Sequence, residues 1–129
     1  MPKTLSNQVF KTAWFSKAAK KAGIGDFALC ETIRQVMAGQ ADDLGGGVFK
    51  KRLNDNMHRC IILARGGRYW VYEYLFAKKD RDNIDNDELV AFRALAKGYA
   101  GMTDLQLAQL VSGKDFVEIC HGDNAQVQK

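Results

Sequence analysis

The sequence has few of the residues on which disulfide-rich proteins and metal sites depend. It contains three cysteines and two histidines in 129 residues. The cysteines, Cys30, Cys60 and Cys120, are odd in number and far apart, so we expect thiols and no disulfide framework. Neither they nor His121 have the spacing of zinc ligands. Because no serine or thiol nucleophile pairs with a histidine, triad chemistry has little support.

Long apolar runs are also missing. No stretch approaches the roughly 20 residues that a membrane-spanning helix needs. The N-terminal segment MPKTLSNQVFK lacks the apolar core of a signal peptide. We therefore expect a soluble, cytoplasmic protein with no membrane partner. A hydrophobic content of 47% over residues 1–129 is sufficient for a single domain with a buried core.

Acidic residues are absent from residues 1–21, which contain five lysines. Residues 45–81 contain nine basic and three acidic residues, whereas residues 82–129 contain four basic and eight acidic ones. The net charge of +4 therefore conceals a basic middle segment. Such a segment is typical of a protein that binds a polyanion, most simply nucleic acid. A solvated basic surface explains the same counts.

Hydrophobic spacing predicts an α+β fold. We expect a short strand at 8–12 and then a helical hairpin, whose second helix is capped by Asp26 and ends near Gly39. From residue 45 onward the apolar period falls to about two, which indicates strands. Three β-rich runs separated by turn signals should form an antiparallel meander: Val48–Leu53, His58–Arg65 and Tyr69–Ala77.

Two capping signatures follow the strands. Asp85 with Glu88, and then Thr103 with Gln106, match capping boxes that begin two further helices. Phe116–Cys120 is a candidate edge strand. The order β-αα-βββ-αα(β) implies a small antiparallel sheet with helices packed on one face.

Two motifs resemble ligand-binding loops. Gly45–Gly47 precede Lys50 as in a phosphate-binding loop, but a strand-like run follows them and no serine or threonine follows the lysines. We interpret these glycines as a loop that leads into the strand. Residues 80–88 resemble a calcium loop, but the central glycine is missing and Ile84 occupies a ligand position. We expect no metal and no other cofactor.

Strand alternation brings cations together. Lys50 and Arg52 share one face of their strand, and Arg59 begins the next strand. Neighbouring cations repel each other unless an anion lies over them. A patch of this kind, extended by the basic residues after the last strand, suits phosphate. The alternative is a solvated sheet face over which these side chains extend.

Three segments carry a resemblance to a known family. They are VFKTAWFSKAAKKAGI, ALCETIRQVMAGQADDLGGGVFKKRL and YLFAKKDRDNIDNDELVAFRALAKGYAGM. Over about residues 8–110 the chain resembles the RelE/ParE toxin superfamily of type II toxin–antitoxin systems, in particular its phage-associated RelE/HigB-like branch. Residues 111–129 form a C-terminal extension outside this resemblance.

The resemblance implies a fold similar to microbial ribonucleases and the activity of a ribosome-dependent mRNA endonuclease. In that reaction the RNA 2′-OH attacks the adjacent phosphate, leaving a 2′,3′-cyclic phosphate and a 5′-OH without a metal. The reaction needs a base near the 2′-OH, an acid near the 5′-O and cations over the phosphate. The implied partners are the ribosome, its mRNA and a cognate antitoxin, expected to be a helix-turn-helix protein.

The resemblance also assigns residues. It implies that Lys50 or Arg52 acts as a base or electrostatically, that Arg59 and Lys79 stabilise transition-state charge, and that Arg81 binds phosphate. The basic neighbours expected to bind RNA are Lys51, Arg65, Arg68 and Lys78.

One position departs from the family pattern. RelE proteins place a tyrosine just after the basic cluster, to stack on a base and help the leaving group, whereas about Asp85 stands there in this chain. Some relatives use a histidine, for which His58 is the nearby candidate. Because an arginine is a poor proton acceptor, Arg52 does not fill the gap. Two alternatives therefore stay open: a ParE-like toxin that inhibits a topoisomerase without nuclease activity, and a non-catalytic RNA-binding protein.

Overall fold

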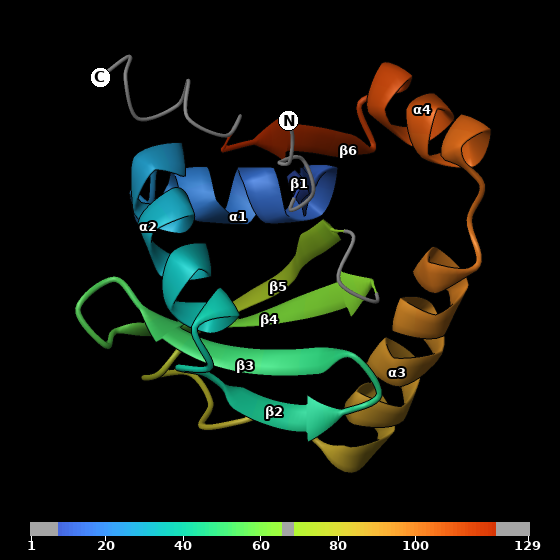
Figure 1. The fold of residues 1–129 in the computed structure, drawn as a ribbon. Helices are drawn as coiled ribbons and strands as arrows, with labels where there is room; N and C mark the ends of the chain where they lie inside the picture. The colour runs from blue at the N-terminus through green and yellow to red at the C-terminus, as the bar shows by residue number, and fades with distance from the viewer. Residues whose placement is uncertain (1–7, 66–68, 121–129) are drawn as a thin grey trace.

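The computed structural model describes residues 8–65 and 69–120. Figure 1 shows how its helices and strands are arranged. The strands are β1 (Gln8–Thr12), β2 (Asp42–Gly45), β3 (Val48–Leu53), β4 (His58–Arg65), β5 (Tyr69–Ala77) and β6 (Phe116–Ile119). The helices are α1 (Ala13–Ala22), α2 (Asp26–Met37), α3 (Asn86–Ala100) and α4 (Asp104–Ser112).

All described strands belong to one sheet, in the order β2-β3-β4-β5-β1-β6. The predicted meander of β3, β4 and β5 is confirmed, with antiparallel pairing throughout. The sheet as a whole is mixed, because β1 runs parallel to β5 and β6 runs antiparallel to β1. β5 therefore lies between two neighbours, which explains why Val71 and Tyr72, on opposite faces, are both fully buried.

Helices cover both faces of the sheet (Figure 1). α1 and α2 pack on one face, here called the hairpin face, over a core that includes Phe15, Leu29 and Ile62. α3 and α4 pack on the other, here called the α3 face, around Phe10 and Ile61. The α+β class is confirmed, but the helices do not share one face as predicted. The reason is that β5 is apolar on both sides, so each side needs a cover.

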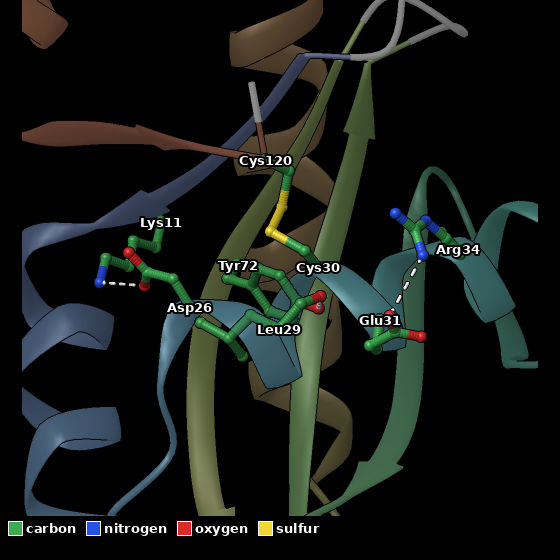
Figure 2. The surroundings of a disulfide bond; sticks show 8 residues. All are labelled: Lys11, Asp26, Leu29, Cys30, Glu31, Arg34, Tyr72 and Cys120. Carbon is green, nitrogen blue, oxygen red and sulfur yellow. Dashed lines mark hydrogen bonds and ion pairs between the residues drawn. A yellow bond between two sulfur atoms is a disulfide. The ribbon is translucent and has the colours of Figure 1, made fainter. Parts of the chain in front are cut away.

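The helix starts follow local hydrogen bonding. Both predicted capping boxes are present: the Glu88 backbone N–H donates to Asp85 Oδ1 at 2.8 Å, and Thr103 and Gln106 repeat the arrangement. The prediction that Asp26 caps α2 is wrong. Gly25 occupies the cap, and Asp26 is the first helical residue. Its carboxylate instead accepts a hydrogen bond from Lys11 Nζ at 2.7 Å (Figure 2).

The glycine run forms the turn between β2 and β3. Gly45, Gly46 and Gly47 all have positive φ values, between 67° and 87°, which L-residues rarely adopt. A Cβ on Gly47 would lie 3.0 Å from the Ala64 carbonyl oxygen, and Arg93 of α3 donates to the Leu44 and Gly45 carbonyls. The glycine run is therefore a hairpin turn packed under α3. This confirms its interpretation as a loop that leads into the strand.

A disulfide joins Cys30 of α2 to Cys120, the residue after β6 (Figure 2). The expectation of free thiols is therefore wrong for two of the three cysteines. The two residues are 90 positions apart, but β6 pairs with β1 at the edge of the sheet and brings its end over α2, with a Cα–Cα distance of 5.5 Å. The third cysteine, Cys60, is free and buried, and burial raises the pKa of its thiol.

The helices of the described part of the chain are short. None of those in residues 8–65 and 69–120 is long and apolar enough to cross a membrane. In the same residues, no cluster of three or more histidine, cysteine or acidic side chains is arranged to hold a metal ion.

Candidate functional site

Three of the predicted cations lie together on the α3 face of the sheet. In the ladder between β3 and β4, Arg52 lies directly opposite Arg59 and Lys50 lies opposite Ile61. Ile61 and Val48 belong to the core under α3, which fixes the face on which Lys50, Arg52 and Arg59 stand. The prediction from strand alternation that Lys50 and Arg52 share one face is confirmed, and the pairing of β3 with β4 adds Arg59 to that face. We call this group the cationic face.

Lys50 and Arg52 form the accessible part of the cationic face. Lys50 Nζ lies 3.9 Å from Asp42 Oδ2, and its side chain is 17% exposed. Arg52 is exposed and, among residues 8–65 and 69–120, its side chain has no hydrogen bond or ion pair. Lys50, Arg52 and Lys51 border a hollow of about 250 Å³, just where β2 begins to pair with β3. The hollow is small and open, which suits a single phosphate group.

Arg59 is the buried member of the cationic face, with 9% exposure. Its Nη1 donates to the carbonyl oxygens of Asn56 at 3.0 Å and His58 at 3.3 Å. These bonds hold the β3–β4 turn, in which Asn54, Asp55 and Asn56 all have positive φ. Arg59 is therefore fixed in place by the turn that it stabilises.

A β-bulge in β5 determines which side chains lie beside Arg59. The pairing of β4 with β5 shifts between Ile61 and Ile62, so that Glu73 has no partner across the ladder. Because the bulge adds one residue, Tyr74 and Phe76 lie on the α3 face, and Phe76 stands directly opposite Arg59. The bulge thus places aromatic rings next to the cationic face.

The segment after β5 brings the second group of predicted residues to the end of the sheet. The Lys78 backbone N–H donates to the Met57 carbonyl at 2.9 Å, which ties this segment to the β3–β4 turn. Lys79 is exposed, and Lys79, His58 and Ala77 border two neighbouring hollows. His58 Nδ1 lies 3.0 Å from Asn54 Nδ2. Lys79 and His58 therefore meet at the end of β4 and β5.

Arg81 connects this segment to α3. Its guanidinium forms two hydrogen bonds with the Glu88 carboxylate, one of them 3.0 Å from Nη1 to Oε2. Its Nε donates to the Asn83 carbonyl at 3.0 Å, and its Cζ lies 5.5 Å from the centre of the Phe76 ring. Arg81 holds the pKa of Glu88 below its usual value through these bonds. The charge of Arg81 is thus largely compensated.

Other predicted residues lie elsewhere. Lys51 points to the hairpin face, and its Nζ donates to the Gln40 carbonyl at 2.7 Å. Arg65 pairs with Tyr69 at the opposite end of β4 from Arg59. Arg68 and the predicted Gly66-Gly67 turn lie outside the described residues. Lys50, Arg52 and Arg59 therefore form one group, and His58, Lys78, Lys79 and Arg81 form a neighbouring one.

Trp14 on α1 is an exposed aromatic residue that the sequence analysis did not single out as a candidate site residue. The structure leaves Trp14 51% exposed, whereas Phe15 beside it is fully buried. The signal was present in the sequence, because two adjacent residues of a helix are about 100° apart and cannot both face one core.

Comparison with known protein families identifies a match over most of the chain. A family described as the RelE toxin of the RelE/RelB toxin–antitoxin system matches residues 7–119, which include every element from β1 to β6. No curated protein matches the chain significantly. A toxin of such a system implies an antitoxin as its partner. Since the match covers most of the chain and its basic strands, the protein belongs to the RelE toxin family.

Proposed function

We propose that this toxin is a ribosome-dependent mRNA endonuclease. It acts in the cytoplasm without a metal, and a cognate antitoxin of the helix-turn-helix class neutralises it. The observation that carries the proposal is the cationic face, where Lys50, Arg52 and Arg59 stand on one side of two adjacent strands. A phosphate that becomes pentavalent gains negative charge, and this face offers cations with one nearby carboxylate, Asp42.

The two accessible cations, Lys50 and Arg52, have different roles because their side chains differ in acidity. Arginine keeps its proton at physiological pH, so Arg52 stabilises charge and does not accept a proton. Lys50 is then the residue we assign to the 2′-OH: its neutral amine would accept the 2′-OH proton, whereas its protonated amine would act as an electrostatic partner. Its partly buried position next to exposed Asp42 fixes its amine close to the strand. The attack joins the 2′-oxygen to phosphorus, and the bond from phosphorus to the 5′-oxygen breaks.

The remaining residues stabilise the transition state or the site itself. Arg59 is held by two carbonyls before RNA binds, so its charge is oriented in advance in a poorly solvated position. Lys79 is exposed and can approach a phosphate at the end of the sheet. Arg81 already bonds Glu88, and we assign it chiefly to general attraction of phosphate and to holding Phe76. Lys78 adds positive charge to the same end.

The leaving 5′-oxygen needs a proton, and His58 is the residue that we propose to supply it. Histidine is the side chain most often used for general acid catalysis. His58 pairs with Leu53 and so lies on the hairpin face, opposite to Arg59, but at the end of the sheet it borders the same two hollows as Lys79. We therefore place the leaving group at that end, within reach of His58 Nε2, since Nδ1 lies 3.0 Å from Asn54 Nδ2. Asp85 cannot take this part, because its carboxylate caps α3.

The capping role of Asp85 also favours a second candidate. A toxin of the ParE type, which inhibits a topoisomerase and has no nuclease activity, does not need the family tyrosine that Asp85 replaces. An RNA-binding protein without catalysis on the same fold would not need it either.

Expression in cells with primer extension on a translated message separates these candidates. We expect cuts in phase with codons, and a loss of about a hundredfold or more when Lys50 or Arg52 becomes alanine. Lys51→Ala is the comparison and should reduce cleavage less, because Lys51 lies on the opposite strand face and its Nζ donates to the Gln40 carbonyl, although it borders the same hollow. Growth arrest with intact mRNA and damaged DNA would support the ParE-like candidate. Bound but uncut message would support the non-catalytic one.

A further inference from the structure

A groove of about 680 Å³ lies between α1 and the end of β5. β1 pairs with residues 69–72 of β5 and then turns into α1. Within the described residues 8–65 and 69–120, no strand pairs with the last residues of β5 on that side. α1 runs beside this free edge and forms the opposite wall. The proposed mechanism uses His58, Lys79 and Arg81 at one end of the groove and assigns no part to α1.

Trp14 is the main side chain of the α1 wall. Its ring stacks on Tyr74 with a centroid distance of 5.1 Å and an interplanar angle of 24°. About half of its surface, 51%, is exposed. Phe15, the next residue, is fully buried in the core and anchors the start of α1. Trp14 is therefore a large flat surface held at the mouth of the groove.

Contacts behind Tyr74 keep this surface in place. The Tyr74 ring packs against Phe76 and Phe92, each with a centroid distance of 5.8 Å. Arg81 Nη1 lies 3.5 Å from the Tyr74 hydroxyl oxygen. Since Glu88 fixes Arg81, the position of Tyr74 is determined from three sides. Trp14 thus rests on a layer of aromatic rings that is ordered before a ligand binds. This order lowers the entropic cost of stacking a ligand on Trp14.

The walls of the groove are mainly basic. Lys21 lies on α1, Lys79 and Arg81 lie opposite, and Asp80 is the acidic residue among those that border the groove. Beside Trp14 the α1 wall consists of Ala18 and Ala22, which leave room next to the ring. A ligand that fits must be planar and anionic.

A nucleotide of single-stranded RNA meets both requirements, because its base stacks on aromatic rings and its phosphate binds cations. The end of the groove at Phe76 and Arg81 adjoins the cationic face, since Phe76 stands opposite Arg59. A strand whose phosphate lies over Arg52 and Arg59 can therefore continue past Phe76 toward Trp14.

We propose that Trp14, supported by Tyr74, is a base-stacking platform that holds a nucleotide next to the phosphate to be cleaved. Lys21 and Lys79 bind the phosphate of that nucleotide. The inference rests on the proposed function, because it assumes that RNA lies on the cationic face. The platform adds a contact to the base of the substrate. This contact does not depend on the RNA sequence, since every base has a flat face.

The fluorescence of Trp14 provides the test. The chain has one other tryptophan, Trp70, which packs against Phe49 with a centroid distance of 5.5 Å. In a Trp70→Phe chain, Trp14 is the sole tryptophan. The probe is a 2′-O-methyl RNA of about six nucleotides, which cannot be cleaved because it has no free 2′-OH. We expect it to quench Trp14, and we expect Trp14→Leu to weaken binding about tenfold.

One further variant and one further oligonucleotide test whether binding depends on stacking of a base on Trp14. Trp14→Phe keeps a ring on Tyr74 and should retain most of the affinity, whereas Trp14→Leu keeps the packing and loses the stack. An abasic oligonucleotide of the same length should bind the Leu variant and the unaltered chain equally well. Circular dichroism checks that each variant is folded.

The outcomes distinguish the platform from the function on which it rests. In one outcome RNA binds and Arg52→Ala weakens its binding, but RNA does not quench Trp14 and Trp14→Leu binds RNA normally. The proposed platform is then wrong, and the proposal that the cationic face binds RNA is supported. If the unaltered chain binds no RNA at low salt and cuts no message, the proposed function fails and the platform fails with it. Quenching together with selective loss in Trp14→Leu supports both.

Discussion

Arg52 and Arg59 stand directly opposite each other in the β3–β4 ladder, and both side chains lie on the α3 face. Like charges in this relation destabilise a sheet. Arg59 is buried and bonded to the turn, while Arg52 is exposed and has no partner in residues 8–65 and 69–120. We therefore expect the Arg52 side chain to raise the free energy of the folded protein, and we expect a bound anion to remove this cost.

The first prediction concerns the stability of Arg52→Gln. Glutamine keeps much of the length of arginine and removes the repulsion from Arg59. We expect the free energy of unfolding to rise by roughly 0.2–1 kcal/mol. Urea unfolding at low ionic strength measures it, and the cleavage assay should show a loss of activity in the same variant.

Salt provides the control for this result. Arg52 is exposed, so added salt screens the repulsion and should reduce the difference between Arg52→Gln and the unaltered chain. Lys51→Gln is the matched variant, because Lys51 pairs with the neutral Cys60 and donates to Gln40. It should give no gain. A loss of stability in Arg52→Gln at low salt would contradict the repulsion.

The second prediction is that Arg59→Lys destabilises the protein although the charge is kept. Lysine has no planar fork, so it cannot hold the Asn56 and His58 carbonyls in the same geometry. We expect the free energy of unfolding to fall by about 1–3 kcal/mol because buried acceptors lose a partner. Arg52→Lys, at the exposed position across the ladder, should change stability little. Equal effects of the two variants would count against the role of Arg59 in the turn.

Much of the cationic face could be predicted from the sequence because it depends on local rules. Alternation along β3 places Lys50 and Arg52 on one face, and the bounds of β3, β4 and β5 follow from apolar period and turn residues. β2 was missed because its four residues, DDLG, neither alternate nor contain a β-branched side chain. The alternation along β3 and the bounds of β3, β4 and β5 are each determined by a few residues that are neighbours in the sequence.

Other features depend on contacts between distant residues. The pairing of Cys30 with Cys120 depends on where β6 enters the sheet, 90 residues later. The capping box identified Glu88 as a partner of the backbone, but not as the partner of Arg81. The bulge at Glu73, which turns Tyr74 toward the α3 face, interrupts a run that is apolar on both sides and leaves no clear pattern.

The third prediction concerns pH and Glu73. Burial raises the pKa of the Glu73 carboxyl, and the Tyr99 hydroxyl donates to Oε1 at 2.8 Å. Because the folded pKa lies above the unfolded one, ionisation costs stability as pH rises above the unfolded value, and below that value the cost is absent. Glu73→Gln keeps an acceptor for Tyr99. It should therefore be more stable than the unaltered chain at pH 7 and similar to it near pH 4.

Urea unfolding at several pH values measures this difference. Glu118→Gln serves as the comparison, since Glu118 lies on the edge strand β6. A Glu73→Gln chain that is less stable than the unaltered one at pH 7 would mean that the charged form of Glu73 is needed by Tyr99.

The fourth prediction concerns the disulfide that ties α2 to the end of β6. A link between residues 90 apart restricts the unfolded chain strongly, by about 4–5 kcal/mol in the loop-entropy description. Reduction, or Cys30→Ser with Cys120→Ser, should lower the free energy of unfolding by up to that amount, and the double variant should not respond to reductant. Protein purified without reductant should release one thiol on unfolding, from Cys60, and three after reduction. Three thiols before reduction would show that the bond is not formed under those conditions. In that case stability should be the same with and without reductant, and β6 would be held by its pairing with β1 alone.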